Sequence, residues 1–198
     1  MRRAEDETVR RLRALHAARL GSGACGGAAD GAEPVVLASA PGRVELAGNH
    51  TDHQGGRTIS AAIDQRAYAL AVPNGTDELR VAMEGFGEAV VRVGEWEPRA
   101  DERGTSQALV RGMAAAYARS GGDVRGCDVA TCSEVPVGSG LSSSAAFEVL
   151  IGAVLRGLDG AKEGATLDPM TLAIDAVEAE RTYFGKPCGM QDQLASAH

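Results

Sequence analysis

The chain lacks a long apolar run. No stretch of it approaches the about 20 consecutive apolar residues that cross a bilayer. Its first residues, Arg2 and Arg3 followed by Glu5, Asp6 and Glu7, contain no apolar segment of the kind found in a secretory signal. These absences predict a cytoplasmic protein without a membrane partner.

Positive charge and cysteine are also scarce. The formal net charge is −7, which argues against nonspecific binding to nucleic acid. The four cysteines, Cys25, Cys127, Cys132 and Cys188, form no Cys-x-x-Cys pair, and no histidines pair at zinc spacing. Neither a zinc knuckle nor a disulfide framework is indicated. Only 4% of the residues are aromatic, but 26 are glycines, which is typical of a globular protein with many backbone-defined loops.

Hydrophobic periodicity predicts both helices and strands. The expected helices cover residues 5–20, 106–119, 144–158 and 169–184. The expected strands cover residues 35–38, 44–47, 67–72, 79–83, 89–93 and 127–132. The Gly/Ala-rich residues 21–34 are expected to form a loop or linker. Because strands and helices do not alternate regularly, we predict an α+β fold rather than a doubly wound sheet.

A glycine- and serine-rich run, residues 136–146, leads from a predicted strand into a predicted helix. Glycines let the backbone approach a ligand, and the free amides of a helix N-terminus favour an anion. The run has no lysine, so it is not a Walker loop, and Ser143 stands where a dinucleotide fingerprint needs a third glycine. A phosphate-binding loop is the leading interpretation, and an ordinary serine-capped helix start is the alternative.

A second polar segment gathers Arg43, His50, Asp52 and His53 between Pro41-Gly42 and Gly55-Gly56. Hydrogen-bonding side chains on such a loop suit a hydroxyl-rich small molecule. Simple turn capping is the alternative, and a metal site on the two histidines has no usual third ligand nearby.

The third segment contains Glu180 and Asp192. Glu180 lies near the end of a predicted helix, where a carboxylate opposes the helix dipole. A magnesium ion held by this carboxylate, a serine hydroxyl of the 136–146 run and phosphates would explain it. Asp192 follows the turn of residues 185–189, which suits a catalytic base or an oriented ion-pair partner. A solvated glutamate and a turn-capping aspartate are the alternatives.

Together the three segments resemble the galactokinase branch of the galactokinase, homoserine kinase, mevalonate kinase and phosphomevalonate kinase (GHMP) superfamily. Residues 136–146 match its phosphate loop, Pro-x-x-x-Gly-Leu-x-Ser-Ser-Ala. Residues 40–53 are similar to the sugar signature, in which Pro-Gly-Arg-Val-Asn-Leu-Ile-Gly-Glu-His-Thr-Asp is typical. Residues 185–193 are similar to Gly-x-Pro-Cys-Gly-x-x-Asp-Gln. Order and spacing agree over residues 35–198.

The resemblance implies an ATP-dependent sugar kinase, galactose being the expected sugar, that acts on the anomeric hydroxyl with Mg2+. It implies a fold like the second domain of ribosomal protein S5, over residues 31–198, preceded by a helix and loop in residues 1–30. The implied catalytic residues are Asp192 and Arg43. The implied sugar contacts are Arg43, Asn49, His50, Asp52, Gly189 and Asp192. The implied nucleotide contacts are Gly138, Ser139, Gly140, Leu141, Ser142, Ser143 and Ser144. The implied metal ligands are Ser144 and Glu180.

Two departures from the family pattern affect these expectations. Asn49 stands where a glutamate is typical, and a neutral amide would tolerate a sugar that carries a carboxylate, such as a uronic acid. The chain also stops at His198 without the family's third motif, so we expect an N-terminal domain only. A regulator that binds sugar and ATP without turnover, and a kinase for a uronic acid or another galactose-like sugar, are the alternative functions.

Overall fold

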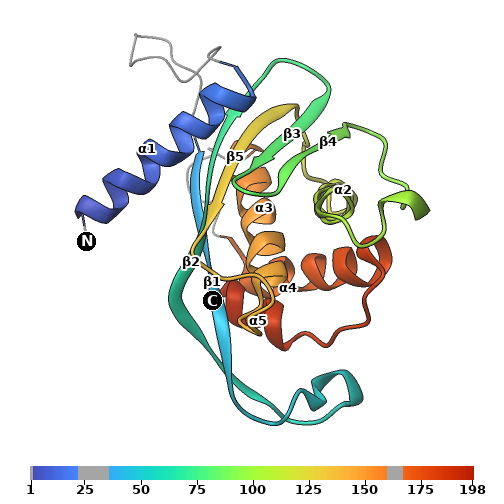
Figure 1. Cartoon of the computed structure of the whole chain (residues 1–198). Coiled ribbons are helices and arrows are strands. Elements are labelled where there is room, and N and C mark those ends of the chain that lie inside the picture. Colours follow the sequence, from blue (N-terminus) through green and yellow to red (C-terminus); the bar gives the residue numbers. More distant parts are fainter. Residues whose placement is uncertain (1, 22–35, 160–166) are drawn as a thin grey trace.

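A five-stranded sheet carries one helix on one face and the other helices on the opposite face (Figure 1). The computed structural model describes residues 2–21, 36–159 and 167–198. The strands, in the spatial order β1-β2-β5-β3-β4, are β1 (Val36–Ala47), β2 (Ile59–Pro73), β5 (Cys127–Ser133), β3 (Glu78–Met83) and β4 (Gly87–Arg92). Neighbouring strands are antiparallel except for the parallel pair of β3 and β5. This arrangement confirms the predicted α+β class.

The central strand β5 is buried on both faces. Cys127 and Val129 face the main helical layer, whereas Ala130 and Cys132 face the single helix on the other side. Successive side chains of a strand point to opposite faces, so a strand covered on both sides needs apolar residues at nearly every position. This requirement explains the nearly continuous apolar sequence of β5.

The single helix is α1 (Arg2–Arg19), which confirms the helix predicted over residues 5–20. Its Leu12 is buried against Leu70 and Val72 of β2. On its charged side, Arg11 pairs at 2.5 Å with Glu84, the residue directly after β3. The predicted linker, apart from Gly21, and the boundary between residues 1–30 and 31–198 lie outside the described residues.

The opposite face is covered by α2 (Ser106–Arg119), α3 (Ser143–Asp159), α4 (Pro169–Glu178) and α5 (Gln191–Ala197). Helix α4 starts at Pro169, as predicted. Asp168 caps it, because its side chain accepts from the Thr171 amide at 2.9 Å. The short helix α5 was missed by the sequence analysis. Among the described residues, no helix is long and apolar enough to cross a membrane.

The helix predicted over residues 169–184 begins and ends as predicted, but its last 6 residues are π-helical rather than α-helical. After Glu178 the chain continues as a π-helical segment, η3 (Ala179–Phe184), which ends at Gly185 with φ +87°. The Glu180 carbonyl accepts the amides of both Gly185, at 3.0 Å, and Lys186, at 3.1 Å. These wide hydrogen bonds turn Glu180 and the residues after it away from the continuous α-helix that the periodicity predicted.

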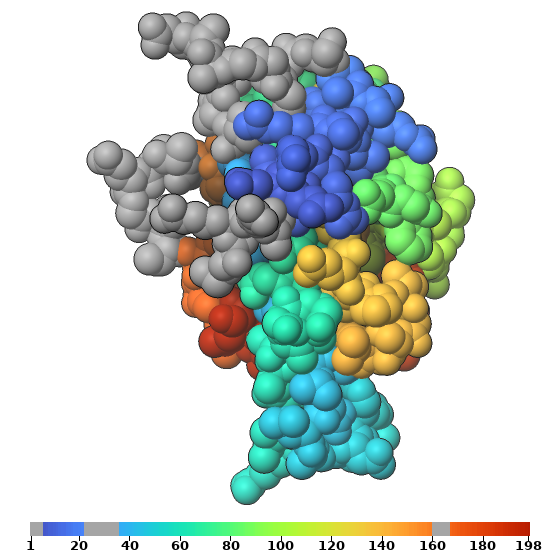
Figure 2. All heavy atoms as spheres, turned by 60° about the vertical axis from the view of Figure 1, so that its left-hand side comes forward, coloured from blue at the N-terminus to red at the C-terminus, as the bar shows by residue number. Residues whose placement is uncertain are grey.

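The strands β1 and β2 extend past the sheet as a hairpin arm, residues 44–62, with the 3-10 turn η1 (Thr51–Gln54) near its tip. Figure 2 shows this arm projecting from the body of the molecule. The two short strands predicted over residues 35–38 and 44–47 are one strand, and β2 begins well before the predicted residue 67. Pairing between β1 and β2 satisfies the backbone of this polar segment, which its sequence pattern alone does not reveal.

A turn at Pro73, Asn74 and Gly75 joins β2 to β3, and the Asn74 side chain accepts from the Thr76 amide at 2.9 Å. The two strands are nevertheless not neighbours, because β5 inserts between them. The sheet thereby brings the end of β5, and the loop that follows it, next to the base of the hairpin arm.

Candidate active site

The glycine- and serine-rich run forms a tight loop between β5 and α3. Gly138 and Gly140 have φ +76°, and Ser142 has φ +60°, in the left-handed region that favours glycine. The loop is fixed to β1, where the Arg43 amide donates to the Leu141 carbonyl at 3.1 Å. A Cβ atom on Gly42 would lie 2.9 Å from that carbonyl oxygen, so this approach requires glycine.

The loop ends at the N-terminus of α3. Ser143 is the first helical residue, and the amide of Ala146 bonds the Ser142 carbonyl at 3.0 Å to close the first turn. The predicted residues Gly138 and Ser139 lie exposed on this loop. An exposed glycine-rich loop that leads directly into a 17-residue helix suits an anion. The positive end of the helix dipole and the free amides both favour negative charge at the helix N-terminus.

Arg43 and Asp192 form an ion pair beside this loop. The Nε atom of Arg43 donates to Oδ1 of Asp192 at 2.8 Å, and Nη2 lies 2.7 Å from the same oxygen. The Arg43 side chain is 4% exposed, whereas that of Asp192 is 25% exposed. The arginine is therefore a fixed, buried cation, and the carboxylate is the member of the pair that remains open to a ligand.

Two loop residues complete this cluster. Nη1 of Arg43 donates to the Gly140 carbonyl at 2.6 Å, and the Ser142 hydroxyl donates to Oδ2 of Asp192 at 2.6 Å. Both oxygens of Asp192 thus have a donor. The loop expected to hold a nucleotide and the carboxylate expected to meet a sugar are joined directly.

His50 and Asn49 begin the turn at the tip of the hairpin arm, and both have φ +53°. Nη2 of Arg43 lies 3.2 Å from Nε2 of His50, which links the turn to the ion pair. Asparagine adopts this left-handed conformation more readily than other non-glycine residues. The backbone therefore gives a reason for asparagine at position 49 that is independent of any ligand.

The sequence analysis missed Glu45, whose carboxylate organises the same turn. Glu45 accepts from the His50 amide at 3.0 Å and from the Gln191 side-chain amide at 3.0 Å. The Gln191 bond, followed by the His50 amide bond, lowers the pKa of Glu45 below its usual range. Its position inside the polar segment was the available signal, but a carboxylate in an expected strand gave no indication of a partner in α5.

Asp52 and Gly189 lie in close contact. The Gln191 amide donates to Oδ2 of Asp52 at 3.0 Å. A Cβ atom on Gly189 would lie 1.7 Å from that oxygen, so only glycine fits.

His53, by contrast, is exposed and makes no contact with this cluster that the structure records. In the described part of the chain, no group of three or more histidine, cysteine or acidic side chains could hold a metal, so the alternative metal site on His50 and His53 lacks ligands.

A second centre forms around Glu180, which is 2% exposed. Its Oε1 atom accepts from the Ser144 hydroxyl at 3.2 Å and from the Lys186 ammonium at 2.9 Å. Its Oε2 atom accepts from the Gln193 amide at 2.7 Å. The structure thus brings together the two residues expected as metal ligands. It adds Lys186 and Gln193, which the sequence analysis did not single out.

A buried carboxyl group lies behind this centre. Glu148 of α3 is completely buried, and its Oε2 atom lies 3.2 Å from the Gln193 amide. Burial, and then the negative charge of Glu180, raise the pKa of Glu148 well above its usual range.

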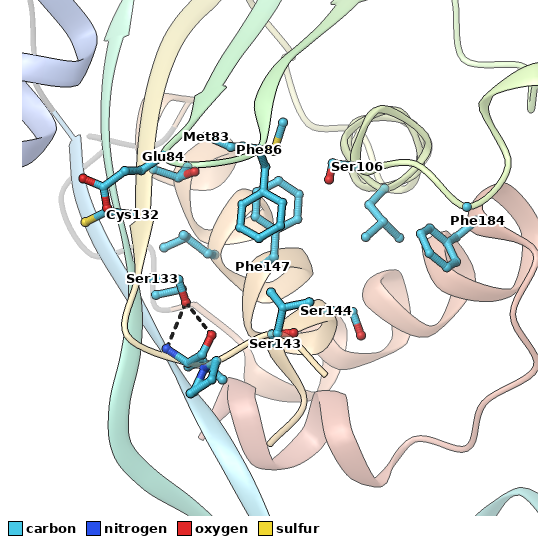
Figure 3. A pocket seen from close by; sticks show the side chains of 18 residues that line it. Met83, Glu84, Phe86, Ser106, Cys132, Ser133, Ser143, Ser144, Phe147 and Phe184 are labelled. Carbon is cyan, nitrogen blue, oxygen red and sulfur yellow. Dashed lines mark hydrogen bonds between the residues drawn. The ribbon is translucent and has the colours of Figure 1, made fainter. Parts of the chain in front are cut away.

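A cavity of about 450 Å3 opens beside Ser143 and Ser144. Figure 3 shows the aromatic rings of Phe86, Phe147 and Phe184 around it, contributed by three separate parts of the chain. Cavities of this size with mostly apolar walls and a few polar groups are typical of small-molecule sites. The sequence analysis did not predict this cavity, because its lining residues are far apart in sequence.

Residues 28–73 match the galactokinase galactose-binding signature, and residues 108–198 match the GHMP kinases N-terminal domain. The chain is 36% identical over 174 residues to a galactokinase of Chloroflexus aurantiacus, and 36% identical over 169 residues to one of Streptomyces coelicolor. Each alignment covers 84% of this chain and 42% of the relative, so the chain spans well under half the length of these proteins.

Among solved structures, the Lactococcus lactis galactokinase in complex with galactose superposes with a TM-score of 0.80 and 27% identity. That match covers 96% of this chain and 46% of the other. The Methanococcus jannaschii mevalonate kinase shares the fold, with a TM-score of 0.66 and 19% identity. That match covers 85% of this chain and 52% of the other.

Proposed function

We propose that this chain forms the half of an ATP-dependent sugar kinase that holds the phosphate loop, residues 136–146, and the sugar loop, residues 40–53. The chain belongs to the galactokinase branch of the GHMP kinases and matches its N-terminal part. The reaction transfers a phosphoryl group to the anomeric hydroxyl of galactose or a closely related neutral sugar. The observation that carries this proposal is the contact of Arg43 and Ser142 with the two oxygens of Asp192, because it joins both loops at one carboxylate.

In this proposal Asp192 orients the sugar hydroxyl and accepts its proton. The partly exposed carboxylate is held from two sides, so it is preorganised for a hydroxyl placed against it. Arg43, buried and fixed to the Gly140 carbonyl, stabilises negative charge that develops on the sugar oxygen. Phosphoryl transfer depends mainly on such positioning and electrostatics.

Two observations support a neutral sugar rather than a uronic acid. The carboxylates of Glu45, Asp52 and Asp192 already surround the sugar loop, and the buried cation among them is Arg43. A further carboxylate on the substrate would be repelled. The left-handed backbone of Asn49 explains the asparagine without an acidic ligand. We assign His50, Asp52, Asn49 and Gly189 to the walls of this sugar site.

The nucleotide is proposed to lie along the loop of residues 138–144, with its base in the neighbouring aromatic cavity. Ser144 and Glu180 fit a magnesium ion, since a hydroxyl and a fixed carboxylate converge there and the carboxylate already faces a cation, Lys186. When bound, magnesium neutralises charge on the transferred phosphate. We further propose that residues 31–198 form the kinase N-terminal domain and that α1 is an addition packed against it.

The test is ATP turnover by the natural full-length protein that carries this sequence. Galactose, galacturonate, N-acetylgalactosamine and arabinose are offered separately, and the sugar 1-phosphate is identified. We expect galactose or another neutral sugar to raise the rate much more than galacturonate does. If no sugar raises the rate, the kinase proposal is wrong, and measurable galactose and ATP binding without turnover would support the regulator instead.

A further inference from the structure

The phosphate loop contains no lysine, yet a lysine ammonium lies beside it. Lys186 stands in the turn after η3, and its Nζ atom donates to Oε1 of Glu180 at 2.9 Å. The Ser144 hydroxyl donates to that same oxygen at 3.2 Å. Because two donors meet on one oxygen atom, the ammonium is next to the first turn of α3, where the loop ends.

The two members of this ion pair differ in freedom. Glu180 is 2% exposed and is also bonded through Oε2 to Gln193, so its carboxylate is fixed. The Lys186 side chain is 54% exposed, and among the described residues Glu180 is the one recorded partner of its ammonium, whereas its backbone amide is fixed to the Glu180 carbonyl. A lysine is a compact charge on a flexible stem of four carbons. Lys186 is therefore the member that can move to another anion.

Arg43, a second cation of the site, is already committed. Arg43 uses Nε for Asp192, Nη1 for the Gly140 carbonyl, and Nη2 for Asp192 and His50. It is buried on the sugar side of the loop. A nucleotide triphosphate on the Ser144 side would therefore need a second positive charge, since phosphoryl transfer requires cations along the phosphate oxygens.

We infer that Lys186 is a phosphate-binding residue, which exchanges its ion pair with Glu180 for an oxygen of the nucleotide phosphates when the nucleotide binds. This inference rests on the proposed function. Lys186, in the turn of residues 185–189, thus takes the role of the lysine that the phosphate loop lacks. The family pattern leaves this position open, so the role is specific to chains with lysine at this place.

The inference is tested with Lys186→Met and Lys186→Arg in the natural full-length protein. We expect Lys186→Met to weaken MgADP binding and to raise the KM for ATP about tenfold, while the KM for the sugar stays unchanged. Lys186→Arg should recover most of the affinity, because it keeps the charge. Arg125→Met removes one positive charge from the connection between α2 and β5, outside the site, and controls for net charge.

A second readout does not depend on turnover. Binding of Mn2+ without nucleotide should become tighter in Lys186→Met, because Glu180 loses its competing cation. Unchanged MgADP affinity in Lys186→Met would overturn the inference and leave Lys186 as a counter-ion of Glu180 only. Equal weakening of sugar and nucleotide binding with a lower Tm would also overturn it. MgADP binding can be measured even if no sugar is phosphorylated, so failure of the kinase proposal and failure of this inference are separable.

Discussion

The Ser142 hydroxyl donates to Oδ2 of Asp192 at 2.6 Å, although the two residues are 50 positions apart. A serine of the proposed phosphate loop therefore fixes the orientation of the carboxylate that is proposed to face the sugar. Any displacement of the loop is transmitted to Asp192 through this bond, so nucleotide and sugar binding are expected to be coupled.

We predict that Asp192→Asn abolishes turnover but preserves sugar binding. The amide keeps the size of the side chain and loses the ability to accept a proton, so kcat should fall by about 10²- to 10⁴-fold. Steady-state kinetics and calorimetric titration with galactose measure the two effects. Ser142→Ala is the matched control, since it removes one contact to Asp192 and retains the carboxylate; its loss should be smaller. A kcat unchanged in Asp192→Asn would remove this residue from the proposed mechanism.

Asn49→Glu separates backbone strain from charge. Glutamate in the left-handed conformation costs about 1–2 kcal/mol, and its carboxylate adds negative charge to the sugar loop. We expect lower stability and a larger ratio of kcat/KM for galactose over galacturonate, measured by coupled assay. Asn49→Gln has the same length without the charge and should show the strain alone. The same ratio in both variants would mean that the charge at position 49 is not sensed by the substrate.

Gly189→Ala should damage the sugar loop. The new methyl group would lie 1.7 Å from Oδ2 of Asp52, so Asp52 must move and its bond to the Gln191 amide is lost. We expect weaker galactose binding, by about tenfold for the loss of one charge-assisted hydrogen bond. Gly55→Ala is the comparison, because Gly55 has φ +78° but open space around its Cβ position. If both variants bind galactose equally well, the Asp52 contact does not shape the sugar site.

Glu148→Gln tests the buried acid. Burial and the nearby Glu180 raise the pKa of Glu148 in the folded protein, so the folded state holds a proton that the unfolded state releases. Stability of the wild type is therefore lost as the pH rises above the ordinary glutamate value, about 4.3. The glutamine variant lacks this titration, so its stability relative to the wild type should increase with pH from that value upward. Chemical denaturation of both proteins at several pH values measures the difference, and a pH-independent difference would contradict the prediction.

The sequence by itself determined most of the strands and helices. The bounds of α2 were predicted because a clear apolar stripe begins after Thr105 and ends before a glycine pair, and both signals are local. The order and spacing of the three motifs also identified the family, since they depend only on the residues present.

Only the tertiary structure decided how the motifs are combined. The insertion of β5 between β2 and β3 brings the phosphate loop against Arg43, and no local signal encodes strand order. The π-helical turn directs Glu180 and Lys186 toward Ser144, and α5 brings Gln191 to Glu45 across 146 positions. These contacts arise from packing between distant segments, which hydrophobic periodicity along the chain does not specify. The loop without a lysine was visible in the sequence, whereas the lysine beside it was recognisable only in three dimensions.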